Sequence, residues 1–298
     1  MSFAVILNPG AREGGERERL AEALAGLRET EVLESRGPGD VAKLARQAAG
    51  GGAETIVAAG GDGTVNEVLN AIAPDFERVR LGILPMGTGN DLARSLGIPA
   101  ELEAAISILA AGRGRRLDVV RMELPAATRL FLNASAGGFS GDVGDKLTPE
   151  VKETWGPFAY LRSALEALPE RCDYRAEILC DGERLSLQAF NVAVANARFI
   201  AGGIPIAPRA ELDDGLLDLV VVTTCRGPQL MAVGAKILRG THLDEDDERI
   251  LYRRARRVEI RCDPPMTFNA DGEALGEDPV RYEVLPRALV VVVGKSAG

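Results

Sequence analysis

The stretch TIVAAGGDGT, residues 55–64, decides the fold, because it joins an apolar run to a glycine-rich turn. Residues 55–59 have the length and composition of a buried strand, and the helical pattern NEVLNAI follows at 66–72. A second stretch of this kind, LGILPMGTGND, occupies 81–91. Each turn therefore lies where a strand gives way to a helix, and such a junction offers backbone N–H groups and a positive helix end to a phosphate.

Individual residues of the first turn suit a phosphate site. Glycines at 60, 61 and 63 permit positive φ and let a phosphate approach the backbone without meeting a Cβ. Thr64 and Glu67 have the spacing of a capping box for the helix at 66–72, and Thr88 and Asp91 repeat that spacing less strictly. Ordinary βα turns are the alternative. Two such turns in neighbouring units, each with Asp, Thr and Asn, favour a nucleotide-phosphate site.

Residues 1–120 alternate short apolar runs with helical patterns, which predicts an α/β domain with a doubly wound parallel sheet. Ligands of such sheets bind beyond the carboxyl ends of the strands, where both glycine turns fall. The first apolar run, at 3–7, ends in Asn8 and Pro9, which form a third loop on the same rim. The chain has neither a GxGxxG sequence after this strand nor a Walker A sequence, so a Rossmann dinucleotide site is disfavoured.

The pattern changes near residue 117, after which apolar runs follow one another with turns between most of them. This predicts a mostly antiparallel β domain over 121–287, with a helical insertion between 149 and 168. Residues 288–298 hold a last apolar strand, and the sequence leaves open whether it packs back on the first domain. Strands are expected at 117–124, 129–135, 175–180, 190–195, 216–222, 258–262 and 280–285.

Composition excludes several classes of protein. The chain has 298 residues and a net charge of −9, which argues against a nucleic-acid-binding protein. His242 is the single histidine and lies among acidic residues, so we expect a solvated loop residue rather than a ligand. None of the four cysteines forms a CxxC pair, which is typical of reduced thiols. With no signal-peptide pattern and no apolar run long enough to span a bilayer, we expect a cytoplasmic protein, at most peripheral at the inner membrane face.

Five stretches together resemble one family along nearly the whole chain. Besides the two glycine turns, they are Asn8-Pro9, the run APRAELDDGLLD at 207–218 and the run NADGE at 269–273. The chain resembles the diacylglycerol kinase catalytic family, in particular its bacterial lipid kinase branch, which is related to the sphingosine kinases. GGDGT alone is shared with NAD kinases and phosphofructokinases, whereas the second turn and the late DGE point to lipid kinases.

The resemblance implies a nucleotide-binding first domain, a β-sandwich second domain and an active site in the cleft between them. It implies ATP as the phosphate donor. Ser35 stands where the family has a threonine that touches ATP. The positions that the resemblance assigns to ATP are Asn8, Pro9, Ser35, Gly60, Gly61, Asp62, Gly63, Thr64, Val65, Asn66, Glu67, Gly87, Thr88, Asn90 and Asp91.

Phosphoryl transfer needs positioning, charge neutralisation and a base for the accepting hydroxyl. Asp62 is placed to hold a catalytic Mg²⁺ directly or through water, and Asp91 is a second candidate; a local turn cap is the other reading of Asp62. The resemblance favours Glu273 as the proton acceptor, with Asp271 close by. The residues alone leave open which carboxylate is the base, and Asp271-Gly272 is also a common hairpin turn.

The resemblance also implies a second, structural Mg²⁺ in the β domain. Asp214 would supply the side-chain ligand, and Glu211 and Leu216 would supply backbone carbonyls. A solvated Asp-Asp-Gly turn is the alternative reading of this segment.

The predicted function is an ATP- and Mg²⁺-dependent lipid kinase acting on a lipid hydroxyl at a membrane surface, most consistent with diacylglycerol or a related lipid. A NAD kinase-like enzyme and a non-catalytic nucleotide or lipid sensor are the alternatives. Two segments suit a membrane contact: the one around Trp155, which equally suits core packing, and an arginine-rich run, which equally suits a solvated strand face. The oligomeric state stays open, a homodimer included. The arginines of that run are at 249, 253, 254, 256, 257 and 261.

Overall fold

The computed structural model describes residues 2–9, 16–27, 29–138, 173–224, 228–244 and 247–294. The chain divides into two compact units. The first contains Met1–Val119, Leu130–Leu132 and Leu285–Gly298, and the second contains Val120–Arg129 and Asn133–Val284. The helical insertion expected between 149 and 168 and the Trp155 segment lie outside the described residues.

A parallel sheet forms the centre of the first unit, in the strand order β4-β3-β1-β2, and the end of the last strand, β15, extends it beside β4. Every residue of β1 and β3 is buried, as expected for strands covered on both faces. The strands are β1 (Phe3–Leu7), β2 (Thr30–Glu34), β3 (Thr55–Gly60), β4 (Arg80–Pro85) and β15 (Val280–Val292). The helices are α1 (Glu16–Ala23), α2 (Asp40–Gly50), α3 (Asp62–Ile72), α4 (Asp91–Ser95) and α5 (Leu102–Ala111).

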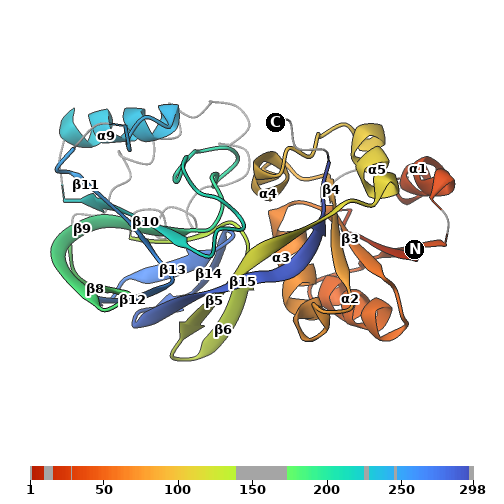
Figure 1. Cartoon of the computed structure of the whole chain (residues 1–298), viewed down its shortest axis with the longest axis horizontal. Helices are drawn as coiled ribbons and strands as arrows, with labels where there is room; N and C mark the ends of the chain where they lie inside the picture. The colour runs from red at the N-terminus through yellow and green to blue at the C-terminus, as the bar shows by residue number, and fades with distance from the viewer. Residues whose placement is uncertain are drawn as a thin grey trace. The chain divides into compact units, whose positions relative to one another are not determined.

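The strand order indicates at which edge of this sheet a ligand would bind. The connection from β1 leads to β2 on one side, and the connection from β3 leads to β4 on the other. Because such crossovers are right-handed, α1 covers one face of the sheet and α2 and α3 cover the opposite face. Accordingly α1 packs against α5 and α2 against α3, and Figure 1 shows these pairs on opposite sides of the strands. The carboxyl ends of β1 and β3 therefore flank the topological switch point, where open α/β sheets bind ligands.

Antiparallel strands build the second unit, in the order β14-β13-β7-β9-β8-β12-β15, with β10 and β11 paired outward from β9. The predicted fold class, a parallel α/β domain followed by a β-sandwich domain, is confirmed. Strands β5, β6 and β15 contribute residues to both units. The remaining elements are β5 (Gly114–Leu124), β6 (Ala127–Phe131), β7 (Ala134–Gly138), β8 (Tyr174–Cys180), β9 (Glu183–Ala195), β10 (Leu217–Thr223), α9 (Pro228–Arg239), β11 (Ile250–Ala255), β12 (Arg257–Asp263), β13 (Thr267–Ala270) and β14 (Glu273–Glu277).

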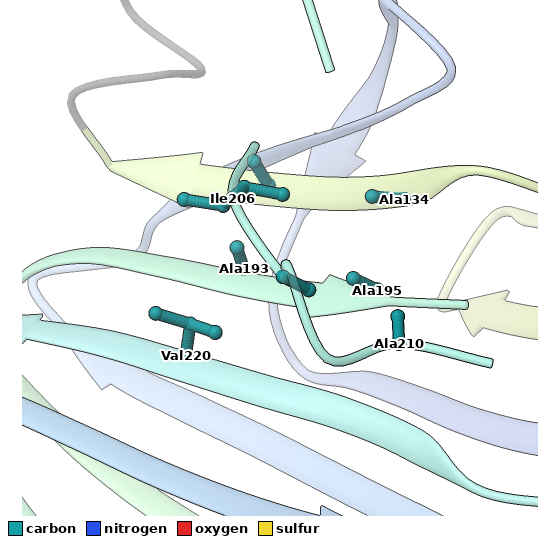
Figure 2. Close-up of a cluster of buried hydrophobic side chains, with 8 residues drawn as sticks. Ala134, Ala193, Ala195, Ile206, Ala210 and Val220 are labelled. Carbon is teal, nitrogen blue, oxygen red and sulfur yellow. The ribbon is translucent and has the colours of Figure 1, made fainter. Parts of the chain in front are cut away.

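Small side chains let an irregular segment lie directly on this sheet. Ala193 and Ala195 of β9 and Ala134 of β7 are all buried beneath Ile206 and Ala210. Figure 2 shows the segment that carries Ile206 and Ala210 passing over these alanines. Larger residues at the strand positions would hold the segment off the sheet, because interiors are packed at crystal-like density. The alanines therefore position residues 206–214, which lead into the predicted structural metal site.

Several elements differ from the sequence expectation. The single strand expected at 129–135 is two strands, β6 and β7, and helix α9 and strand β11 were not predicted. The strands expected at 280–285 and within 288–298 are one strand, β15. The pattern for α9 is present in the sequence, because Leu230, Val233 and Ile237 recur at helical spacing and pack on the sheet.

Candidate functional site

A chain of side-chain hydrogen bonds crosses the carboxyl ends of three neighbouring strands. Ser35 follows β2, and its hydroxyl donates to Asn8 Oδ1 at 3.3 Å. Asn8 follows β1, and its Nδ2 donates to Thr64 Oγ1 at 3.1 Å in the first turn of α3. The backbone N–H of Asn8 also donates to the carbonyl of Ala59 at 3.0 Å. Three positions predicted from far apart in the sequence thus meet at the switch point.

Helix α3 begins at Asp62, four residues earlier than the sequence pattern suggested. Thr64 is therefore inside the first helical turn, and the predicted capping box is wrong, since no side chain caps this helix. The N–H of Val65 makes the first helical bond, to Gly61 at 3.1 Å. The N–H groups of Gly63 and Thr64 precede that bond and have no partner inside the helix, which leaves them directed beyond its N-terminus.

Space, not backbone handedness, explains the glycines of the first turn. None of Gly60, Gly61 and Gly63 has φ in the left-handed region, so the expected positive φ is wrong. A Cβ on Gly60 would stand 2.3 Å from Thr64 Oγ1, which the packing forbids. At the exposed Gly63, no described atom lies within 4 Å of the Cβ position. At Gly63 the backbone of the turn is therefore accessible from outside.

The two glycine turns touch each other. A Cβ on Gly87 would stand 2.4 Å from the Cα of Gly61, and the N–H of Met86 donates to the carbonyl of Gly60 at 3.0 Å. Asn90 closes the second turn, because its side-chain amide accepts from the N–H of Gly87 at 3.1 Å and donates to the Gly87 carbonyl at 2.6 Å. The two turns form one surface, on which the exposed Thr88 and Gly63 lie at the tips.

Asp62 links the two turns through its carboxylate. One oxygen accepts the N–H of Asp91 at 3.1 Å and the other accepts the N–H of Leu92 at 3.3 Å, so Asp62 caps helix α4 rather than its own helix. Asp91 itself is buried. Carboxylate oxygens are among the ligands that Mg²⁺ prefers in proteins. Half-buried Asp62 thus fits a Mg²⁺ held directly or through water.

The next residues of α3 face inward. Val65 and Asn66 are buried, and Asn66 Nδ2 donates to the carbonyl of Leu130 at 3.1 Å. Asn70, which the sequence did not single out, exchanges two hydrogen bonds with the backbone of Leu130, at 2.9 Å each. One helical turn separates the two asparagines, so this spacing was the available signal. Asn66 thus fixes β6 against α3, while Glu67 is half-buried.

In the second unit, the acidic hairpin joins β13 to β14. Ala270 pairs with Glu273, and the two turn residues, Asp271 and Gly272, have φ of 47° and 87°. Positive φ at both positions is the signature of a type I′ turn. The carboxylate of Asp271 accepts the N–H groups of Asn133 at 3.2 Å and Ala134 at 3.3 Å. Glu273 is exposed, and its carboxylate has no hydrogen-bond partner among the described residues.

In the predicted structural metal site, the carboxylate of Asp214 already has two partners. Asp214 Oδ1 accepts the N–H of Leu216 at 3.0 Å, and Oδ2 forms an ion pair with the Arg254 guanidinium. Glu211 is exposed. Among the described residues, no group of three or more His, Cys, Asp or Glu side chains is arranged to hold a metal ion. Arg254 already supplies the positive charge beside Asp214.

Arg254 also lies near a buried acid that the sequence analysis missed. Asp218, on β10, is 1 % exposed, and its Oδ1 lies 3.8 Å from Arg254 Nε. Tyr252 donates its hydroxyl proton to the same oxygen at 2.5 Å. Burial, with a smaller contribution from Glu211, raises the pKa of Asp218 to about 6, and the Tyr252 bond opposes that shift.

His242 is buried, so the expected solvated loop position is wrong. Its side chain is 1 % exposed, and Nε2 lies 2.9 Å from the carbonyl of Ile206. Because a carbonyl can only accept, Nε2 carries the proton. Nδ1 is buried without a hydrogen-bond partner among the described residues, and burial lowers the pKa of the imidazole. The acidic neighbours in the sequence concealed that this side chain turns inward.

Ion pairs use half of the arginine-rich run. Arg249 pairs with Asp247 at 2.6 Å, Arg254 with Asp214, and Arg257 with Glu283 at 2.7 Å. The other three are exposed. One lies on β11, one between β11 and β12, and one on β12, and the predicted membrane contact stays a prediction. These are Arg253, Arg256 and Arg261.

Comparison with known proteins places the chain in a family. The profile of the diacylglycerol kinase catalytic domain matches residues 2–122, and that of the YegS C-terminal NAD kinase beta sandwich-like domain matches 136–293. A diacylglycerol kinase of Bacillus subtilis is 33 % identical over 298 residues, with 98 % of this chain and 96 % of the relative covered. The chain belongs to the diacylglycerol kinase family.

Other members of the diacylglycerol kinase family agree over the same length. A diacylglycerol kinase of Staphylococcus carnosus is 29 % identical over 295 residues, covering 98 % of this chain and 94 % of the relative. A crystal structure of a diacylglycerol kinase from Bacillus anthracis superposes with a TM-score of 0.78 at 26 % identity, covering 100 % of this chain and 98 % of that one. The predicted family, fold and kinase class are thereby confirmed, and a kinase uses a nucleotide. No described helix is long and apolar enough to cross a membrane.

Proposed function

We propose that this protein is an ATP- and Mg²⁺-dependent lipid kinase that phosphorylates a hydroxyl of diacylglycerol or a closely related lipid. The observation that carries the nucleotide half is the contact between the two glycine turns at Gly61 and Gly87. It brings the N-terminus of the 11-residue helix α3 and the tip of the second turn onto one surface. The open backbone at Gly63 and the helix end suit the phosphates of ATP.

The charge on those phosphates requires a cation. Asp62 is the carboxylate of the first turn and lies where the two turns meet, so we assign Mg²⁺ to it. When bound, Mg²⁺ neutralises charge on the β- and γ-phosphates. The protein's own contribution is to hold Asp62 against α4, so that the carboxylate stays on the surface shared by both turns.

The hairpin supplies the base in this proposal, and the two carboxylates differ in what they contact. Asp271 accepts two backbone N–H groups, which fixes the turn against β7. Glu273 is exposed and has no such partner among the described residues, so its oxygens are available to a hydroxyl. We therefore assign proton acceptance to Glu273 and anchoring to Asp271.

The acceptor class follows from the family. Relatives that align over nearly the whole chain are named diacylglycerol kinases. A diacylglycerol keeps its acyl chains in a bilayer, so the enzyme would meet its acceptor at the membrane surface while remaining peripheral to it.

A transfer assay tests the proposal. The purified protein receives labelled ATP, Mg²⁺ and one of several acceptors: diacylglycerol in mixed vesicles, other lipid alcohols, or NAD. We expect label in the lipid and none in NAD. Glu273→Gln should lower kcat by at least about 100-fold with the ATP Kd unchanged. Glu277→Gln is the matched control, since Glu277 is an exposed carboxylate at the other end of β14 and should keep wild-type turnover. Transfer to NAD alone, or to no acceptor, would refute the assignment.

A further inference from the structure

A buried pair of hydroxyls lies directly behind the acidic hairpin. Ser135, on β7, is fully buried, and Tyr282, on β15, is 1 % exposed. Their oxygens are 2.8 Å apart. The hydroxyl of Ser135 also lies 2.5 Å from the carbonyl of Asn269, which is the next-to-last residue of β13 before the hairpin turn. Neither hydroxyl has a role in the reaction proposed above.

Donor counting gives this chain of bonds a direction. The carbonyl of Asn269 can only accept, so Ser135 donates its single proton to it. Tyr282 must then donate to Ser135, which makes a relay from the phenol through the serine to the backbone of β13. Burial raises the pKa of the Tyr282 phenol, so the phenol remains a donor throughout the working pH range.

The relay ends where the hairpin is irregular. Opposite β14, the register of β13 shifts between Phe268 and Asn269, so that Phe268 faces Gly276 and Asn269 faces Ala274. A bulge of this kind re-aims the side chains beyond it and weakens the ladder that holds them. The extra residue is Leu275 of β14, and Glu273 lies two residues from it on the same strand. The Ser135 hydroxyl therefore binds β13 at the point where the pairing between β13 and β14 is irregular.

Packing holds the relay in one geometry. The rings of Phe268 and Tyr282 meet edge to face, with centroids 6.3 Å apart. A Cβ on Gly137 would stand 2.6 Å from the Phe268 ring, so β7 and β13 are closely apposed here. Buried networks with every member paired are rigid and specify one arrangement.

Resting on the proposed function, we propose that Ser135 and Tyr282 are positioning residues that fix β13 opposite the bulge of β14 and thereby set the orientation of Glu273 toward the acceptor hydroxyl. Neither residue touches a substrate. Displacement of a reacting group by about 1 Å costs about 100-fold in rate, so loss of one bond in the relay should lower kcat measurably.

The test uses Tyr282→Phe, which removes the donor and keeps the ring. We expect kcat to fall about tenfold with the ATP Kd unchanged, because the nucleotide site is on other residues. Tyr252→Phe is the matched control: it also removes a tyrosine hydroxyl bonded to a buried partner, Asp218, but lies outside the hairpin. The control should lose thermal stability and keep wild-type kcat.

Combination with Glu273→Gln separates positioning from general destabilisation. If the relay acts through Glu273, Tyr282→Phe lowers kcat in the wild-type background but causes no further loss in the Glu273→Gln background. Ser135→Ala should reproduce this pattern. An unchanged kcat for Tyr282→Phe, or an equal loss in both backgrounds, overturns the inference. Absence of lipid phosphorylation by the wild-type protein overturns the proposed function, and the inference with it.

Discussion

Gly87 and Gly61 approach so closely that a Cβ on Gly87 would stand 2.4 Å from the Cα of Gly61. Two turns that are separated by a strand and a helix in the sequence are thus joined backbone to backbone. The contact requires glycine for space, and it makes the two turns a single surface at the end of the sheet.

Gly87→Ala should lower the folding stability, whereas Gly63→Ala should lower the affinity for ATP. Gly87→Ala forces the turns apart and should cost about 1–3 kcal/mol of folding free energy. Gly63→Ala adds a methyl group where no described atom lies within 4 Å, so the melting temperature should be unchanged or slightly raised. If phosphates approach this backbone, Gly63→Ala should weaken ATP binding about tenfold or more. Differential scanning calorimetry and titration calorimetry measure both quantities. Wild-type ATP affinity in Gly63→Ala would contradict the phosphate position.

Asp62→Ala should lose activity and also some stability. The substitution removes the cap on α4, at a cost of about 1 kcal/mol, together with the carboxylate assigned to Mg²⁺. Turnover should fall by at least about 100-fold. Asp181→Ala is the matched control, because Asp181 likewise accepts two successive backbone N–H groups, from Arg256 and Arg257 at 2.9 Å each. Asp181 has φ of 47°, where alanine adds backbone strain, so the control should lose at least as much melting temperature with unchanged turnover. Wild-type turnover in Asp62→Ala would contradict its assigned role.

His242 should make stability depend on pH. Burial lowers its pKa in the folded protein below the unfolded value of about 6.5, so the unfolded chain binds more protons in between. The contribution of neutral His242 to stability is therefore complete above pH 6.5 and is lost as pH falls below it. The charged groups that face the imidazole are Asp244, which opposes the shift, and Arg209, which adds to it.

The comparison with His242→Gln isolates this effect. The glutamine amide nitrogen takes the position of Nε2 and can donate to the Ile206 carbonyl, but it does not titrate. We expect wild type to be more stable at pH 7.5 and the difference in melting temperature to narrow at pH 5.5. Asp218, whose raised pKa of about 6 favours folding on acidification, is common to both proteins and cancels. A difference that stays constant with pH would show that His242 does not titrate in this range.

Arg254 should make the β domain independent of added magnesium. Its guanidinium already pairs with Asp214 and lies near Asp218, so a chelator should leave the melting temperature of the wild type unchanged. Arg254→Ala should cost about 1 kcal/mol, since the pair is partly screened by solvent, and should restore stabilisation by Mg²⁺. Arg253→Ala is the control on the same strand; its guanidinium bonds only the Tyr252 carbonyl among the described residues. A chelator-sensitive wild type, with bound Mg²⁺ by elemental analysis, would support the structural metal instead.

Much of the first unit could be predicted from local patterns. The buried strands and the glycine turns are continuous segments, and their periodicity and turn chemistry act within a few residues. The helix start at Asp62 was misplaced because Thr64 and Glu67 matched a capping box, whereas Asn8 uses the Thr64 hydroxyl. His242 was misplaced because its neighbours in the chain are acidic, while its partner is the Ile206 carbonyl. In both cases the decisive partner is distant in the sequence.

The chain's own order of residues determined its class, its rim of turns and the identity of its acidic groups, because strands, turns and charges are written in short runs. Folding decided which groups meet: Gly61 with Gly87, Asp62 with Asp91, and Ser135 with Tyr282. It also decided that Asp271 is bound to backbone while Glu273 is exposed. The physical reason is that hydrogen bonding and close packing depend on distances of a few ångströms in space. The separation of two residues along the sequence does not give that distance when they lie on different strands or turns.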